Sequence, residues 1–108
     1  MTQDERKQIA NTIFSQLGGN RFKVMTGAHS FTAGDKGELT FKFPNGKDGF
    51  KAMRVELTPM DVYTITFFRF KGSLKKGNLG VEQVEHKNIY AEDLAGLFES
   101  ETGLRTSL

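Results

Sequence analysis

The sequence predicts a single α+β domain in which one antiparallel sheet of about five strands carries an N-terminal and a C-terminal helix packed on one face. Apolar residues recur at helical spacing near both ends of the chain, and those between them alternate as in half-buried strands. The 108 residues suffice for one core, so residues 1–108 form one domain. No crossover helix separates the strands, so neighbouring strands run antiparallel.

The first helix is predicted over residues 4–17. Its apolar residues lie on one stripe, which is formed by Ile9, Ile13, Phe14 and Leu17. Asp4 is a candidate N-cap, and Gly18 can adopt the left-handed conformation that ends a helix. The short run 22–25, which follows the glycines, is predicted to be the first strand.

Alternation defines the central strands. In residues 39–43, Leu and Phe alternate with Thr and Lys, which is typical of a strand with one buried face. Turn residues at 44–49 lead into a returning strand at 53–57, so the two form a hairpin. A third strand is predicted over 62–70, rich in β-branched and aromatic residues, and a short strand at 81–86 closes the sheet.

The remaining segments are predicted from turn and capping residues. A second helical stripe consists of Tyr90, Leu94, Leu97 and Phe98. This helix is expected to begin near Asn88 and to end at Gly103. Residues 31–37 are predicted to be a turn, and residues 71–80, with three Gly and three Lys, an exposed mobile loop.

The sequence shows no motif for catalysis or metal binding, so neither an enzyme nor a cofactor is predicted. The chain has no Cys, and its two histidines, His29 and His86, lack ligands at metal-site spacing and are expected to face solvent. The glycines at 18–19 follow a helix, whereas a phosphate-binding loop precedes one. A helix end is therefore favoured there, with a ligand loop as the alternative.

A candidate binding surface follows from the outward-facing residues of the strands. The alternation places Lys42, Ala52 and Phe68 in one row, and it makes Arg54 a neighbour of Thr40 and Thr66. Basic and aromatic side chains together are what single-strand binders use. The predicted partner- or nucleic-acid-binding residues are Lys42, Arg54, Phe68, Phe70, Lys71, Lys75 and Lys76. In the alternative, Phe68 or Phe70 packs beneath the lysine-containing loop.

Four segments resemble a family of small, functionally uncharacterised proteins that bacteriophages and mobile elements encode. They are LGGNRF at 17–22, MTGA at 25–28, LTPMD at 57–61 followed by Tyr63, and TGLRTSL at 102–108. The resemblance spans nearly the whole chain in order, except residues 71–80. The family has no assigned activity, so it implies a context only: small phage proteins often cover a surface of a host complex or bind nucleic acid.

These observations predict a non-enzymatic phage-type binding protein that occupies a host protein or ribonucleoprotein complex. An anti-defence, anti-CRISPR-like inhibitor that acts as a nucleic-acid mimic or a steric block fits this description. The alternative is a nucleic-acid-binding domain that uses the basic and aromatic sheet face. The N-terminal segment is polar and no apolar run approaches the ~18 residues of a membrane span, so we expect a location in the host cytoplasm and no membrane partner.

Overall fold

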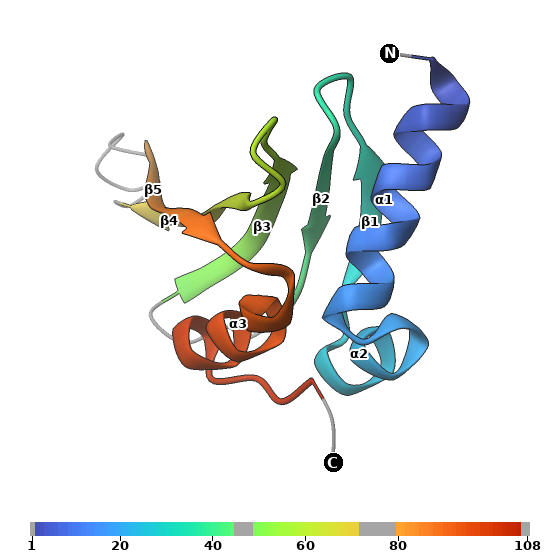
Figure 1. Cartoon of the computed structure of the whole chain (residues 1–108). Coiled ribbons are helices and arrows are strands. Elements are labelled where there is room, and N and C mark those ends of the chain that lie inside the picture. The colour runs from blue at the N-terminus through green and yellow to red at the C-terminus, as the bar shows by residue number, and fades with distance from the viewer. Residues whose placement is uncertain (1, 45–48, 72–79, 107–108) are drawn as a thin grey trace.

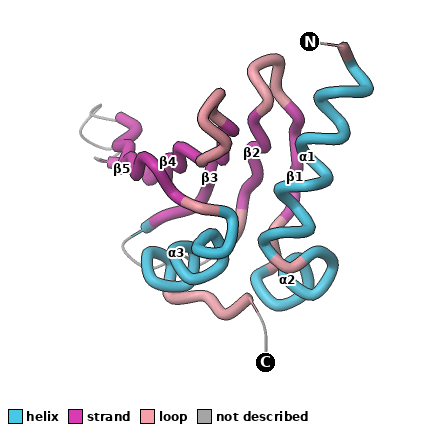
Figure 2. Tube along the Cα trace, in the orientation of Figure 1, coloured by secondary structure: helices cyan, strands magenta, loops and turns pink. Residues whose placement is uncertain are grey.

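The computed structural model describes residues 2–44, 49–71 and 80–106 (Figure 1). Five antiparallel strands form one sheet in chain order (Figure 2): β1 (His29–Ala33), β2 (Glu38–Lys42), β3 (Phe50–Leu57), β4 (Tyr63–Lys71) and β5 (Gly80–Ile89). The helical segments are α1 (Gln3–Leu17), α2 (Gly19–Thr26), η3 (Ala91–Asp93) and α3 (Leu94–Thr102). The predicted α+β class, with a helix at each end of the chain, is confirmed.

The core lies between one face of the sheet and the helices. Its strand residues alternate inward as the sequence predicts, and they include Leu39, Phe41, Met53, Val55, Ile65 and Phe67. The helices contribute Ile13, Leu17, Phe22, Leu94 and Phe98. The Phe22 ring stands edge-on to Phe98 at 5.0 Å and to Phe41 at 5.4 Å, so it joins α2, α3 and β2. Figure 1 shows α1 alongside β1, and α2 and α3 at one end of the molecule.

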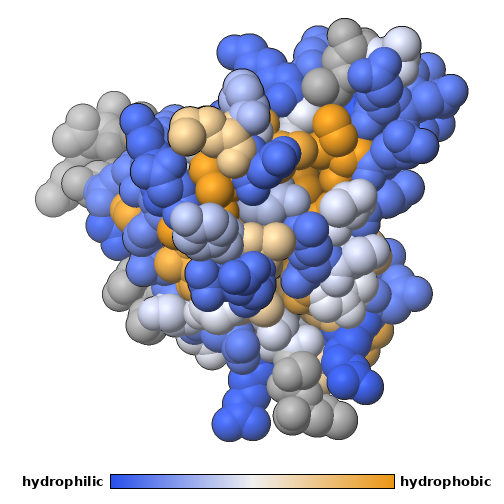
Figure 3. All heavy atoms as spheres, in the orientation of Figure 1, coloured by the Kyte–Doolittle hydropathy of each residue, from blue (hydrophilic) through white to orange (hydrophobic). Residues whose placement is uncertain are grey.

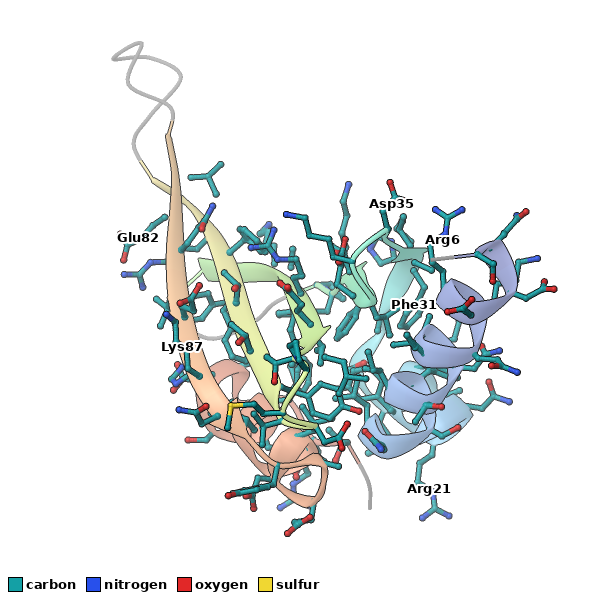
Figure 4. All side chains as sticks on the ribbon, turned by 45° about the horizontal axis from the view of Figure 1, so that its top comes forward. Arg6, Arg21, Phe31, Asp35, Glu82 and Lys87 are labelled. Carbon is teal, nitrogen blue, oxygen red and sulfur yellow. The ribbon has the colours of Figure 1, made fainter. Side chains whose placement is uncertain are left out.

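Helix α1 begins slightly earlier than predicted. Thr2, rather than Asp4, is its N-cap, because the Thr2 hydroxyl accepts a hydrogen bond of 3.2 Å from the Glu5 amide. The helix ends at Gly18, whose φ is 129°. This confirms a helix end at the first glycine pair. An ion pair between Arg6 and Asp35 attaches α1 to the turn between β1 and β2 (Figure 4).

The predicted first strand at 22–25 is wrong, because these residues belong to α2. Phe22 and Thr26 are both buried, and their spacing of four residues places them on one face of a helical turn. The Thr26 hydroxyl donates a hydrogen bond of 2.7 Å to the Phe22 carbonyl, which is the i to i−4 geometry of a helix. Val24 points outward and is 80% exposed. A run of four residues is too short for period alone to separate strand from helix.

The first strand is instead β1, and part of it falls in the predicted turn at 31–37. Phe31 of β1 faces inward, where its ring stacks on Phe41 at 5.2 Å and meets Phe14 edge-on at 5.1 Å. A bulge near Ser30, whose φ is 59°, interrupts the alternation that would have indicated this strand. The turn itself is shorter, and the Gly34 amide closes it with a bond of 2.9 Å to the Glu38 carbonyl.

The C-terminal part also differs from the prediction in its boundaries. Strand β5 continues to Ile89, so Asn88 lies in a bulge with a φ of 60° rather than at a helix start. The predicted end at Gly103 is confirmed, since its φ is 74° and its amide donates to the Glu99 carbonyl at 2.9 Å. Most of the predicted loop at 71–80 lies outside the described residues.

Tyr63 links β4 to α1 and gives a test of this packing. Its hydroxyl donates a hydrogen bond of 2.6 Å to Gln16 Oε1, and burial raises the pKa of the phenol above 10.0. The folded state therefore holds this proton more tightly than the unfolded chain. Its contribution to stability is complete below pH 10 and is lost as the pH rises through the raised pKa.

Tyr63→Phe is expected to lower the free energy of unfolding by about 1 kcal/mol at pH 7, because the hydrogen bond to Gln16 is lost. The same variant should lose less stability than the wild type when the pH is raised above 10. Urea unfolding at both pH values measures the two effects. An unchanged stability at pH 7, or an equal loss in both proteins at high pH, would contradict this description of Tyr63.

Candidate functional site

The face of the sheet opposite the helices, here called the open face, carries two rows that strand pairing fixes. One row runs Lys42, Ala52, Phe68, Gln83, and the next runs Thr40, Arg54, Thr66, Glu85. These are the neighbours that the alternation predicted for Lys42, Arg54 and Phe68. The strand backbones therefore hold the three predicted side chains on one surface.

Arg54 and Phe68 form the central contact of the open face. The guanidinium carbon of Arg54 lies 5.4 Å from the centroid of the Phe68 ring, and both side chains are half-buried. A planar cation over an aromatic face restricts the rotamers of both groups. In the described part of the chain, Arg54 thus covers part of Phe68. Most of the lysine-containing loop that was the predicted alternative cover lies outside the described residues.

The other predicted binding residues are placed less fully. Lys42 is exposed at the end of β2. Phe70 and Lys71 end β4, where their backbones pair with Val81 and Gly80 of β5. Lys75 and Lys76 lie outside the described residues. The structure thus brings together Lys42, Arg54 and Phe68, and of Phe70 and Lys71 it places the backbones at the end of β4.

The surface is hollowed beside the row formed by Lys42, Ala52 and Phe68. The cavity, here called the open-face hollow, has a volume of about 500 Å³. Its lining residues come from all five strands and from the loop after β2, and they are His29, Lys42, Phe43, Pro44, Lys51, Ala52, Phe68, Arg69 and Val81. Its volume lies within the roughly 300–1,000 Å³ of small-molecule sites. The hollow combines apolar surface with several cationic groups.

Sequence reasoning missed His29 and Lys51, and bulges explain why. A bulge in β1 pairs His29 with Lys42, which brings the imidazole to the open face. A second bulge, between Phe50 and Ala52, leaves Lys51 exposed where simple alternation would turn it inward. No residue pattern marks either bulge. The only hint in the sequence is that Phe50 and Phe31 carry apolar side chains outside the predicted strands.

The cations of the hollow differ in how their charge is compensated. Arg69 forms an ion pair with Glu82, and its guanidinium lies 5.3 Å from the Phe50 ring centroid. Lys42 and Lys51 have no ion pair with any residue in the described ranges. The two ammonium groups are therefore available to an anion that enters the hollow.

The opposite end of the open face is acidic. Glu38 of β2 pairs with Glu56 of β3, two rows away from the pair formed by Lys42 and Ala52. The two carboxylates repel each other, and they would also repel an anionic group of a partner or ligand placed beside them. The open face is thus cationic at the hollow and anionic at its far end. A partner would have to match both signs, or be small enough to contact only the hollow.

The structure gives the histidines different surroundings. His29 is exposed, as predicted, and its Nδ1 lies 2.9 Å from the Ser30 hydroxyl. The prediction of a solvent-facing His86 is wrong: the side chain is half-buried, edge-on to Phe67 at 5.9 Å, with Nε2 at 3.7 Å from Glu101 Oε1. Within the described ranges, no group of three or more His, Cys, Asp or Glu is placed to hold a metal ion.

The helical side of the molecule is mainly hydrophilic, with hydrophobic patches between the polar groups (Figure 3). Arg21 of α2 points away from the body of the protein there (Figure 4). In the part of the chain that the structure describes, no helix is long and apolar enough to cross a bilayer.

Searches of protein-family models, curated proteins and solved structures gave no significant match.

Proposed function

We propose that this chain is a non-enzymatic binding protein that occupies a host macromolecule through the open face of its sheet. The observation that carries the proposal is the register of that face. Helices pack on the opposite side, while Lys42, Arg54 and Phe68 project together from three paired strands. Such a surface is rigid before binding, so little conformational entropy is lost when a partner docks.

The composition of the open face favours a macromolecular partner with both polar and apolar features. Arg and aromatic residues are the usual anchors of interfaces, and here Arg54 and Phe68 are already held against each other. The cations near Lys42 and the acids Glu38 and Glu56 form two regions of opposite sign. Charge arranged in this way contributes mainly to specificity and to the rate of association.

The proposed context is infection of a bacterial host. The resemblance to small phage proteins supports a role in the host cytoplasm, with a host protein or a ribonucleoprotein complex as partner. An anti-defence, anti-CRISPR-like inhibitor that works by steric block fits a small chain with one preformed binding face. In this proposal the protein acts stoichiometrically, and inhibition requires one copy for each partner site.

A second candidate function, direct binding of single-stranded nucleic acid, is favoured by one specific observation. Lys42 and Lys51 line the same hollow as Phe68 on an antiparallel sheet, and Arg54 lies over the Phe68 ring. Single-strand binders combine cations for the phosphates with an aromatic platform for a base. The acidic pair Glu38 and Glu56 restricts this contact to the part of the face that carries the hollow.

Capture of partners from host lysate tests the proposal and separates the two candidates. Lys42→Glu/Arg54→Glu is expected to lose the partner, because it reverses two charges of the open face. Arg21→Glu/Arg105→Glu, which makes the same charge change at exposed positions elsewhere, should retain it. A partner that persists after nuclease treatment supports the host-protein function, and one lost with nuclease supports the second candidate. Equal capture by both double variants would overturn the role of the open face.

A further inference from the structure

We propose that the open-face hollow binds one nucleotide, with the base against Phe68 and the phosphate at Lys42 and Lys51. The ligand class is a nucleoside phosphate, either free or as one unit of a single strand. The inference deepens the second candidate function, direct binding of single-stranded nucleic acid. Only the case in which the nucleotide is one unit of a strand rests on that function. Binding of a free nucleotide is measured on the isolated protein and is independent of any host partner.

The apolar surface of the hollow suits a planar ring. Phe68, Ala52, Pro44 and Val81 line it, and Val81 is 57% exposed although it is apolar. A volume of about 500 Å³ is large enough for a small organic ligand, by comparison with the roughly 300–1,000 Å³ of known sites. An aromatic base would remove this apolar surface from water and stack on the phenyl ring.

Arg54 prepares Phe68 for this role. Its guanidinium lies over the ring at 5.4 Å, yet Arg54 does not line the hollow. Phe68 thus contacts Arg54 and also lines the hollow. A ring fixed in this way loses little rotamer freedom when a base stacks on it, and the cation reinforces the contact.

The charges of the hollow select an anion. Lys42 and Lys51 lie on neighbouring strands and have no ion pair within the described ranges, whereas Arg69 is already paired with Glu82. An additional donor is available from the exposed imidazole of His29. Two ammonium groups beside an apolar wall match a ligand that carries a phosphate at one end and a ring at the other.

The size of the ligand follows from the rest of the open face. Glu38 and Glu56 occupy its far end, where the phosphates of a long strand would meet two carboxylates. An acidic protein segment would satisfy the lysines but would leave the wall formed by Phe68 and Val81 without an aromatic partner. A single nucleotide places a phosphate at the lysines and a base against the apolar wall. It therefore fits the hollow better than an extended strand or an acidic peptide.

Calorimetric titration with adenosine monophosphate, and with ribose 5-phosphate as the probe that lacks a base, tests the proposal. At low salt we expect the nucleotide to bind at least tenfold more tightly than the sugar phosphate. Phe68→Leu should weaken nucleotide binding about tenfold and leave sugar phosphate binding unchanged. Lys42→Gln/Lys51→Gln should weaken both ligands about tenfold and flatten the salt dependence, whereas Arg21→Gln/Arg105→Gln should change neither.

A measurement on the unmodified protein does not depend on the folding of any variant. Amide chemical shifts of the wild type, titrated with adenosine monophosphate, should move around Lys42, Ala52 and Phe68 and stay constant in α1 and α3. Shifts confined to the helices, absence of nucleotide binding by the folded protein, or equal affinity for both probes would overturn the proposal. The host-macromolecule function would survive that failure, because lysate capture tests it separately.

An eight-residue thymidine strand distinguishes the two sources of the ligand. Binding at least tenfold tighter than thymidine monophosphate, lost in the Phe68→Leu variant, identifies a strand as the source. Equal affinity for strand and mononucleotide, with the same loss in that variant, identifies a free nucleotide. A strand that binds equally well to the wild type and to the Phe68→Leu variant contradicts stacking in the hollow.

Discussion

Phe22→Ala is expected to lower the free energy of unfolding by about 3–5 kcal/mol, the usual cost of truncating a fully buried Phe. The Phe22 side chain has no exposed surface, and its ring meets Phe98 and Phe41 edge-on. Its loss removes the contact that joins α2 to both α3 and β2. The surrounding rings are held by other packing, so they cannot collapse fully into the space.

Urea unfolding of the Phe22→Ala variant measures this effect, and Val24→Ala in the same helix is the matched control. Val24 is 80% exposed, so its truncation should change stability by at most about 0.5 kcal/mol. The comparison also tests the correction of 22–25 from strand to helix, because a strand would not place these two residues so differently. A cost below about 1 kcal/mol for Phe22→Ala would show that α2 is not docked in solution.

Gly18→Val is expected to have the second largest effect, a loss of about 2 kcal/mol or more. With φ at 129°, a β-branched residue is strained whatever space surrounds it. An added Cβ would also lie 3.1 Å from Phe22 Cβ, closer than ordinary van der Waals contact. The strain would act at the junction where α1 ends and α2 begins.

Thermal melts and urea unfolding measure the Gly18→Val change against Gly96→Ala. Gly96 lies in α3 at an exposed position, and a Cβ there would meet nothing within 4 Å. Because Ala favours a helix over Gly, this control should gain about 0.5–1 kcal/mol. If Gly18→Val is as stable as the wild type, the sharp helix end at Gly18 does not exist in solution.

The sequence predicts the sheet best where alternation is regular. Leu39, Phe41 and Val55 follow a period of two, so their burial and the outward row of Lys42, Ala52 and Phe68 could be deduced together. The prediction fails where that period is interrupted. The bulge near Ser30 interrupts the alternation in β1, so this strand is not recognised from the sequence. The brief run at 22–25 fits a strand and a helical turn equally well.

The candidate site was predictable only in part for the same physical reason. The pairing of Arg54 with Thr40 and Thr66 follows from register, and it is confirmed. The hollow depends on two register shifts, which bring His29 and Lys51 to it, and a shift of one residue leaves no mark in composition. The contact between His86 and Glu101 joins β5 to α3 and likewise depends on tertiary packing.

Site-specific photo-crosslinking in host cells tests most directly the central claim that the open face binds a host macromolecule. A photoreactive residue at Gln83, exposed beside Phe68, should give a discrete crosslinked product. The same residue at Val24, exposed on α2, should give none. Crosslinks from Val24 alone, or equal crosslinks from both positions, would contradict the account.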